Sequence, residues 1–261
     1  MQPLVMGIVN VTPDSFSDGG RYFSAAAAVE HGRQLAAEGA DILDIGGEST
    51  RPGADAVDVE TELARVVPVI RALAPLGVRL SVDTTKAQVA LAAVAAGASL
   101  INDVSASLET VAAELGVGWI AMHRKGDPKT MQGQAQYDDV VAEVCRDLAA
   151  AAARAERAGV QEIWLDPGIG FGKTTKHNLA LLAHIDEVVA LGYPVCVGAS
   201  RKRFLGELLA ASDGVDHVNS DDRREGSLAA TTTAIIGGAT MVRVHDVRMT
   251  VHAARVVAAA V

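Results

Sequence analysis

Residues 79–102 have the sequence RLSVDTTKAQVALAAVAAGASLIN, and this stretch decides the fold class. It begins with a short apolar run at 79–82, continues into an alanine-rich run at 87–96 and reaches a second apolar run at 99–102. Alanine favours helix, and Gly97 stands where helices commonly end with a left-handed residue. The stretch therefore predicts a strand, a helix, a glycine cap and a second strand, which is a βαβ unit of a parallel sheet.

The same order of strand, helix and glycine repeats along the whole chain. We predict eight strands, at residues 4–10, 41–45, 79–82, 99–102, 119–122, 163–165, 194–197 and 241–244. We predict helices at residues 25–38, 60–73, 87–96, 108–115, 138–158, 178–191, 201–209 with 225–237, and 247–259. No linker-like or low-complexity tract divides the chain, and a barrel of such units takes about 250 residues. We therefore expect residues 1–261 to form a single α/β domain.

Two α/β architectures are compatible with this order of elements, a doubly wound open sheet and a closed (β/α)8 TIM barrel. Nearly every predicted strand ends in, or is followed by, a polar residue. An open sheet would scatter these side chains, whereas a closed barrel gathers them at the mouth where barrel enzymes have their active sites. The pattern favours the single (β/α)8 TIM barrel. The polar residues are Asn10, Glu48, Asp83, Asn102, His123, Asp166, Ser200, Arg243 and His245.

Composition and charge exclude several classes of protein. The net charge is −9 over 261 residues, so no general basic field is available for nucleic acid or an anionic membrane. The apolar runs are short and interrupted by charge, so we expect neither a spanning helix nor a signal peptide, and we expect a cytoplasmic protein. Cys145 and Cys196 have no CxxC spacing, and we predict small core residues rather than a disulfide.

Three side chains at the predicted mouth suit the hydrogen-bonding edge of a heterocycle. Asp83, Asn102 and Asp166 each follow an apolar run. A carboxylate can accept hydrogen bonds from two adjacent N–H groups, and asparagine supplies both a donor and an acceptor. Together they fit a 2-amino-4-oxo pyrimidine ring. Helix N-capping is the alternative for any one of them, but three on one rim favour a ligand site.

Cationic side chains follow the last two predicted strands. Residues 198–203, GASRKR, place Lys202 and Arg203 at the start of a helix. A helix N-terminus already attracts anions, so added cations predict an anion-binding site, with a solvated basic turn as the alternative. Arg243 and His245 share one face of the final strand by its period of two. We predict that they clamp a diphosphate, Arg243 by bidentate hydrogen bonds; a structural role for His245 is the alternative.

Three loops complete the predicted mouth. Residues 10–20, NVTPDSFSDGG, form a long loop with Phe16 between two aspartates, which favours a lid over an ordinary turn loop. Residues 46–53, GGESTRPG, place Arg51 next to a rigid proline, either as a partner for the first loop or as a solvated charge. The glycine-rich residues 166–173, DPGIGFGK, match no nucleotide-binding spacing. Any metal would be Mg²⁺ bridging phosphate oxygens, because no cluster of ligands marks a zinc or two-metal site.

Seven motifs resemble those of the dihydropteroate synthase family, in order and along essentially the whole chain. They are NVTPDSFSDGG at 10–20, ESTRPG at 48–53, SVDT at 81–84, NDV at 102–104, DPGIGFG at 166–172, SRK at 200–202 and RVHD at 243–246. The resemblance implies a TIM barrel that condenses 6-hydroxymethyl-7,8-dihydropterin diphosphate with 4-aminobenzoate. The products would be 7,8-dihydropteroate and diphosphate, in folate biosynthesis. It also implies Mg²⁺ as cofactor and a homodimer.

The resemblance assigns roles to individual residues. The pterin would be held by Asp83, Asn102, Asp166 and Lys202. The diphosphate would be contacted by Thr50, Arg243 and His245, and Asn10 would help to hold Mg²⁺. The aminobenzoate pocket would be completed by Phe16, Arg51, Pro52 and Phe171. Arg203 replaces a hydroxyl residue of some family members, which implies that a guanidinium helps to bind the aminobenzoate carboxylate. The catalytic set would be Asp83, Lys202, Arg243 and His245.

Two other functions share parts of this pattern. A catalytically silent pterin-binding paralogue would keep the pterin contacts, but it would need no clamp for a leaving group. A pterin-dependent methyltransferase would use the same barrel, but the sequence contains no appended corrinoid domain. The loops at 10–20 and 46–53, together with RVHD at 243–246, favour the synthase.

Overall fold

The computed structural model describes residues 2–12, 25–49, 56–126, 133 and 135–260, and its eight strands form one parallel sheet. The strands are β1 (Leu4–Asn10), β2 (Ile42–Gly46), β3 (Arg79–Asp83), β4 (Leu100–Asp103), β5 (Gly118–Met122), β6 (Ile163–Asp166), β7 (Cys196–Val197) and β8 (Met241–Val244). Their order is β6-β5-β4-β3-β2-β1-β8-β7. A further parallel bridge joins Leu165 to Val195 and brings the two edges together. The predicted (β/α)8 barrel is confirmed.

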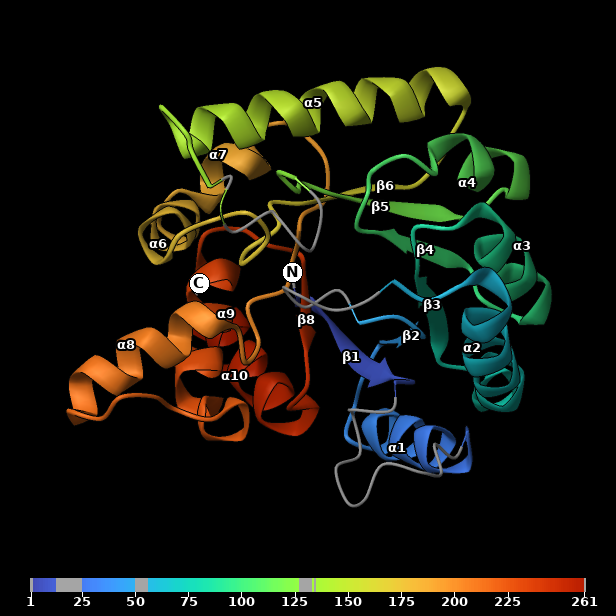
Figure 1. Ribbon diagram of the computed structural model, residues 1–261, viewed down its shortest axis with the longest axis horizontal. Helices are drawn as coiled ribbons and strands as arrows, with labels where there is room; N and C mark the ends of the chain where they lie inside the picture. Colours follow the sequence, from blue (N-terminus) through green and yellow to red (C-terminus); the bar gives the residue numbers. More distant parts are fainter. Residues whose placement is uncertain (1, 13–24, 50–55, 127–132, 134, 261) are drawn as a thin grey trace.

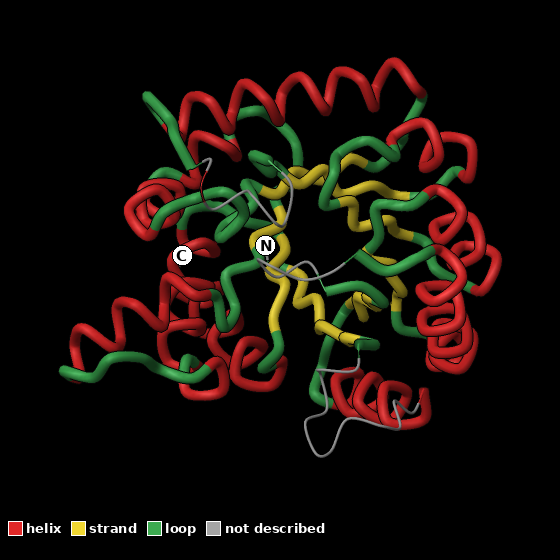
Figure 2. Tube along the Cα trace, viewed as in Figure 1, coloured by secondary structure: helices red, strands yellow, loops and turns green. Residues whose placement is uncertain are grey.

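Helices surround the ring of strands, as Figures 1 and 2 show. They are α1 (Ala25–Ala37), α2 (Val59–Leu73), α3 (Ala87–Ala96), α4 (Glu109–Leu115), α5 (Val140–Ala158), α6 (Thr175–Ala183), α7 (Ile185–Val189), α8 (Arg203–Asp213), α9 (Arg224–Ile236) and α10 (Val247–Ala260). The single helix predicted at 178–191 is wrong, because His184 has φ −121° and ψ 35° and separates α6 from α7. The seventh strand is also shorter than the predicted 194–197.

The inside of the barrel is apolar at one level and polar at the next. The apolar side chains that pack against one another there are Met6, Ile42, Leu100, Ile120, Trp164, Cys196 and Met241. Side chains two residues apart on a strand point to the same face. The residues two positions further along four of these strands are Asp44, Asn102, Asp166 and Arg243. The period of two therefore places an apolar plug beneath a ring of polar and charged side chains.

The opposite faces of the strands pack against the helices. Leu43, Ile45, Leu80 and Val82 are buried there in the larger core that the helices cover. Both cysteines are free, with Cys196 buried and Cys145 partly buried. In the described part of the chain, none of the helices combines the length and the apolar character needed to cross a membrane.

An ion pair lies at the end of the barrel opposite the strand tips. Arg79 begins β3 and donates two hydrogen bonds, of 2.7 and 2.6 Å, to the carboxylate of Glu162, which precedes β6. The Trp164 indole donates to the same carboxylate at 2.7 Å. A bidentate arginine–carboxylate pair is geometrically specific. This pair therefore ties the start of β3 to the start of β6.

Candidate active site

Asp44 lies at the centre of the polar layer. Its side chain is fully buried, and one carboxylate oxygen accepts hydrogen bonds from Asn102 Nδ2 at 2.9 Å and Arg243 Nε at 2.6 Å. A terminal nitrogen of Arg243 donates to Asp83 at 2.7 Å. Residues from β2, β3, β4 and β8 are thus joined directly inside the barrel.

The remaining charged side chains enter from β6 and from the segment after β7. One carboxylate oxygen of Asp166 accepts from the backbone N–H of Gly168 at 2.7 Å. Lys202 donates from Nζ to the carbonyl of Ile169 at 2.6 Å, and Nζ lies 4.0 Å from the centre of the Phe171 ring. Lys202 interacts electrostatically with Asp166, Arg243 and Asp83. These residues therefore face one site rather than separate cavities.

Gly198 brings the two sides of the site close together. A Cβ atom at this position would lie 3.7 Å from Cβ of Arg243 and 3.9 Å from a carboxylate oxygen of Asp166. A larger side chain would fill the space between the arginine and the carboxylate. The glycine of the GASRKR segment therefore keeps the centre of the site open.

Burial shifts the protonation of the charged groups. Burial raises the pKa of Asp83 to about 7; Arg243 opposes this shift and Asp44 adds to it. Burial also raises the pKa of Asp166 and lowers that of Lys202 to about 7. For Arg243, burial lowers the pKa, but Asp44 and Asp83 outweigh that effect and raise it. Arg243 is thus a permanent cation, whereas Asp83 and Lys202 titrate near neutral pH.

Two carboxylate oxygens in the site have no hydrogen-bond partner. They are Oδ1 of Asp44 and Oδ1 of Asp83, both buried. The Ser81 hydroxyl, on the same face of β3 as Asp83, is likewise buried without a partner. Leaving a buried acceptor unpaired costs about 1–3 kcal/mol. These oxygens can accept hydrogen bonds from the N–H groups of a ligand.

Hydrogen bonds connect the segments that follow β7 and β8. The Ser200 hydroxyl and Nδ1 of His245 are 2.9 Å apart, and the His245 backbone N–H donates to that hydroxyl at 3.2 Å. Arg201 donates to both carboxylate oxygens of Asp246, at 3.1 and 2.8 Å, and to Asp221 at 2.7 Å. The SRK and RVHD motifs therefore hold one another in place through the two residues that precede Lys202.

Helix capping does not explain the predicted acceptors. The N-cap residues of α3, α4 and α6 are Lys86, Leu108 and Thr174. Asp83, Asn102 and Asp166 all precede these positions and point into the barrel. Asp103, by contrast, organises the turn after β4, because it accepts hydrogen bonds from the backbone N–H groups of residues 105, 107 and 108.

The other predicted site residues have different outcomes. Asn10 ends β1, half-buried, on the inward face with Met6. Arg203 begins α8 with a side chain that is 64% exposed and pairs with Glu207 at 3.2 Å. The roles assigned to these two residues stay predictions. The remaining predicted residues, Phe16, Thr50, Arg51 and Pro52, lie outside the described residues.

Asp44 is a site residue that the sequence analysis did not select. It stands within the apolar run of β2, two residues after Ile42 and two before Gly46. The period of two places it on the same inward face as Ile42, and a charged residue at such a position needs a partner. The signal in the sequence is a single charged residue inside an apolar strand, rather than a polar residue at the tip of the strand.

Lys86 organises the exit from β2. Its ammonium pairs with Glu48 and, at 2.6 Å, with the fully buried Glu62. Glu48 also accepts from the backbone N–H of Val57 at 3.4 Å, and Arg65 donates to the carbonyl of Gly47 at 2.7 Å. Glu48, the first residue of ESTRPG, is thereby linked to α2 and to the residue that precedes α3.

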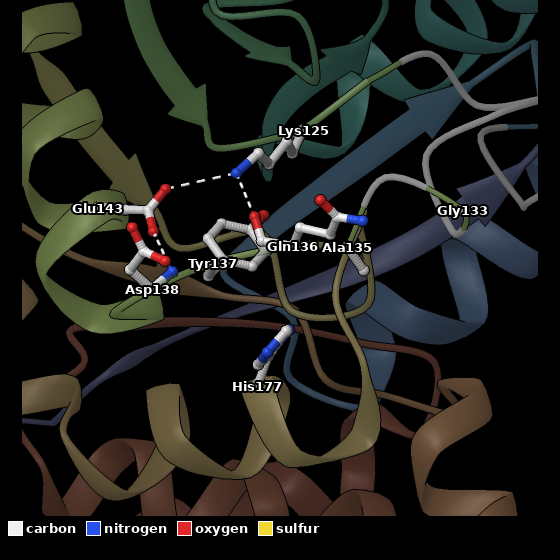
Figure 3. Close-up of a pocket in the computed structure, with 8 residues that line it drawn as sticks. All are labelled: Lys125, Gly133, Ala135, Gln136, Tyr137, Asp138, Glu143 and His177. Atoms are coloured by element: carbon white, nitrogen blue, oxygen red, sulfur yellow. Dashed lines mark hydrogen bonds and ion pairs between the residues drawn. The ribbon is translucent and has the colours of Figure 1, made fainter.

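A separate cavity of about 600 Å³ lies beside the segment that follows β5 (Figure 3). Its lining includes Lys125, Tyr137, Glu143 and His177, and none of the charged residues in the barrel. Lys125 and Glu143 form an ion pair of 3.4 Å across it. The Tyr137 hydroxyl donates to the carbonyl of Gly172 at 3.1 Å, so this cavity adjoins the outer side of the glycine-rich loop.

Comparisons with known proteins agree with this site. The model of the pterin binding enzyme family matches residues 6–245. The dihydropteroate synthase of Mycobacterium leprae is 49% identical over 98% of this chain and 92% of its own. The Xanthomonas albilineans dihydropteroate synthase solved with 4-aminobenzoic acid has a TM-score of 0.91 and 50% identity, covering 99% of this chain and 93% of its own. The same enzyme solved in complex with 7,8-dihydropteroate has a TM-score of 0.88 and 47% identity, with coverages of 99% and 94%. The chain therefore belongs to the pterin binding enzyme family and, within it, to the dihydropteroate synthases, which are transferases.

Proposed function

We propose that the chain condenses 6-hydroxymethyl-7,8-dihydropterin diphosphate with 4-aminobenzoate to give 7,8-dihydropteroate and diphosphate. The observation that carries this proposal is the direct contact of Arg243 with Asp44 and Asp83 in one buried site. Carboxylates that can accept hydrogen bonds from the edge of a heterocycle therefore lie next to a cation that can stabilise a leaving diphosphate. The solved relatives with 4-aminobenzoic acid and 7,8-dihydropteroate support the same pair of ligands.

The pterin ring would lie over the polar layer of the barrel. Asp83 has an unpaired buried oxygen that suits a ring N–H donor. Asp166 keeps one carboxylate oxygen beyond its bond to Gly168, and Asn102 keeps an amide oxygen. Lys202 would donate to a ring acceptor. A ligand that satisfies the orphaned oxygens removes the cost of leaving them unpaired.

The hard step is cleavage of the C–O bond between the pterin methylene and the diphosphate. The bonding electrons leave with the diphosphate, and the dihydropterin stabilises the positive charge on the methylene. Arg243 and His245, with Thr50, would stabilise the leaving group, and Asp83 would stabilise the cationic pterin. The neutral amine of 4-aminobenzoate then forms the C–N bond and loses a proton, which needs position more than a strong base.

The aminobenzoate would bind beside the glycine-rich loop. Lys202 Nζ lies over the Phe171 ring, so a cation and an aromatic face meet at this side of the site. Phe16, Arg51 and Pro52 would complete the pocket. Arg203 would contact the carboxylate of the substrate by turning from its exposed pair with Glu207.

Mg²⁺ is part of the proposal, with Asn10 as a protein ligand. Among the described residues no group of three acidic, histidine or cysteine side chains could hold a metal by itself. One amide oxygen at the mouth nevertheless fits Mg²⁺, which commonly takes few protein oxygens together with substrate phosphates and water. The ion would neutralise charge on the diphosphate.

Three broader expectations belong to the same proposal. Strands from residues 4 to 244 share one sheet, which supports a single domain over residues 1–261. Two free cysteines suit a reducing compartment and support a cytoplasmic location. The resemblance of the chain to its family supports a homodimer.

Turnover tests the proposed function. The purified chain, mixed with both substrates and Mg²⁺, is expected to form dihydropteroate and diphosphate in equal amounts. Formation of neither product, with pterin binding intact, would establish the silent paralogue instead. Methyl transfer from methyltetrahydrofolate in place of this reaction would establish the methyltransferase.

A further inference from the structure

Lys173, the last residue of DPGIGFGK, has a buried side chain that the proposed reaction does not use. It is only 2% exposed. Its ammonium donates to the carbonyls of Gly168 at 3.0 Å and Phe171 at 3.1 Å, and to that of His123 at 3.3 Å. It also lies 2.9 Å from Nδ1 of the His123 ring. A glycine-rich loop that could have bound phosphate through N–H groups instead directs its carbonyls at an internal cation.

Between about pH 4 and pH 7, a charged Lys173 donates to a neutral His123. Burial and, to a smaller extent, the charge of Lys173 lower the pKa of His123 to about 4. The neutral ring accepts at Nδ1 when its proton is on Nε2, which lies 3.4 Å from the carboxylate of Asp147. Burial lowers the pKa of Lys173 to about 7, while Asp166 opposes the loss of its charge. The chain Asp147–His123–Lys173 thus orients the ammonium towards the loop.

The loop in turn places Lys202. The carbonyl of Ile169 accepts from Lys202 at 2.6 Å, and the Phe171 ring lies 4.0 Å from the same ammonium. Ile169 lies between Gly168 and Phe171 in the chain, and Lys173 binds the carbonyls of both of these residues. The backbone N–H of Gly170 donates to Asn178 at 2.7 Å, which fixes the loop from the other side.

We propose that Lys173 is a positioning residue that holds the carbonyls of loop 167–172 and thereby sets the place of Lys202 and Phe171 in the substrate site. Lys173 itself makes no contact with substrate. The proposal rests on the proposed function, because its readout is the binding of the two substrates. Lys173 would thereby affect the pterin side of the site through Lys202 and the aminobenzoate side through Phe171.

Substitution of Lys173 by methionine is the direct test, and Lys176→Met is the matched control. Lys176 is an exposed lysine three residues further on, in α6. Lys173→Met keeps the length and apolar stem but removes the donors. We expect KM for both substrates to rise about tenfold with kcat changed by less than about threefold, the signature of lost ground-state positioning. Lys176→Met is expected to match the wild-type chain in both constants.

A double-mutant cycle separates positioning from general loss of structure. If Lys173 acts through Lys202, then Lys173→Met should raise the KM for dihydropterin diphosphate by less than about twofold in a Lys202→Met background. An equal increase in both backgrounds, or no increase in the wild-type background, overturns the proposal. Activity of the wild-type chain reports separately on the proposed function.

A second variant covers the case in which Lys173→Met does not fold. His123→Leu keeps Lys173 and replaces the ring, whose nitrogen accepts from it, by an apolar group of similar size. We expect the same dependence on Lys202, with a smaller rise in KM, while circular dichroism monitors folding. A folded His123→Leu variant whose KM rises equally with and without Lys202 contradicts the proposal.

Discussion

At the scale of single residues, Arg243 lies between the carboxylates of the site and its second cation, Lys202. It contacts Asp44 and Asp83 directly, and it interacts electrostatically with Lys202. A guanidinium can donate several hydrogen bonds in fixed directions, so it can bind two carboxylates and still face a phosphate. This geometry explains why an arginine rather than a lysine suits the inward face of β8.

Replacement of Arg243 by alanine should impair the chemical step. We expect kcat/KM to fall by about 10², as when one donor to developing charge is removed. The control is Arg255→Ala, an exposed arginine on α10. Steady-state kinetics at saturating 4-aminobenzoate measures the effect, and near-normal rates would contradict the assignment.

Replacement of Lys202 by alanine should act mainly on substrate binding. The lysine contacts the glycine-rich loop and lies beside Asp166, so its loss removes a donor to the pterin ring. We expect a higher KM for dihydropterin diphosphate, measured by varying that substrate alone. An unchanged KM would remove Lys202 from the pterin site.

The pH dependence of kcat/KM should follow Asp83 and Lys202. Burial raises the pKa of Asp83 to about 7, so the carboxylate that accepts N–H donors is lost as pH falls below that value. Burial lowers the pKa of Lys202 to about 7, so its positive charge is lost as pH rises. We expect a bell-shaped profile with its maximum near neutrality. Rates that stay constant from pH 5 to 9 would contradict this account.

The sequence allowed most of the acceptors and cations to be predicted at this scale, because they stand at strand tips. Asp83, Asn102, Asp166, Lys202 and Arg243 all face the common site. Asp44 was not predicted as a site residue because it lies inside an apolar strand. The partners of Lys173 could not be predicted either, since they are backbone carbonyls brought near by the conformation of a loop.

At the scale of elements, the glycine-rich loop between β6 and α6 shows how backbone conformation serves the site. Gly168 has φ +66°, and a Cβ atom there would overlap the carbonyl oxygen of His123. Gly192, after α7, has φ +87° with open space around it. The two glycines therefore share a left-handed backbone but differ in their surroundings.

This pair gives a matched prediction. Gly192→Ala should lower the free energy of unfolding by about 1–2 kcal/mol, the cost of a left-handed L-residue. Gly168→Ala should cost more, because the loop must also move from His123, and it should raise KM for both substrates. Urea unfolding and steady-state kinetics measure the two effects. Equal costs with unchanged KM would contradict the role given to this loop.

The ends of a helix or strand could be predicted where the local sequence pattern determines them. The βαβ unit at 79–102 agrees with the structure because alanine content, the glycine cap and the apolar runs all favour the same elements. The helix predicted at 178–191 failed at His184, where the chain leaves the helical conformation although apolar residues continue on both sides. Only the packing of α6 and α7 against their neighbours decides such a break.

At the scale of the whole molecule, the helices α9 and α10 leave large apolar side chains exposed. Ile236 and Val256 are 63% and 69% exposed, in the C-terminal halves of two adjacent helices. Exposed apolar residues that gather on one face commonly mark a protein interface. The outer surface of α9 and α10 is therefore where we expect the proposed homodimer to form.

Sedimentation should show a species of twice the 27.0 kDa of one chain. Val256→Arg should shift it towards the single chain, because burial of a charge opposes association. Leu91→Arg, on the exposed side of α3, is the control and should leave the mass unchanged. A wild-type chain that sediments as a monomer at micromolar concentration would contradict the expected dimer.

At the same scale, acceptors from β3, β4 and β6 and cations from β8 and from the segment after β7 face one site, and we expect them to bind one substrate molecule together. Titration calorimetry with dihydropterin diphosphate tests it most directly. We predict one site per chain, weakened at least about tenfold both by Asp166→Asn and by Arg243→Met, which act on opposite ends of the same ligand. Affinity that survives either substitution unchanged would place these residues outside a common site and contradict the account.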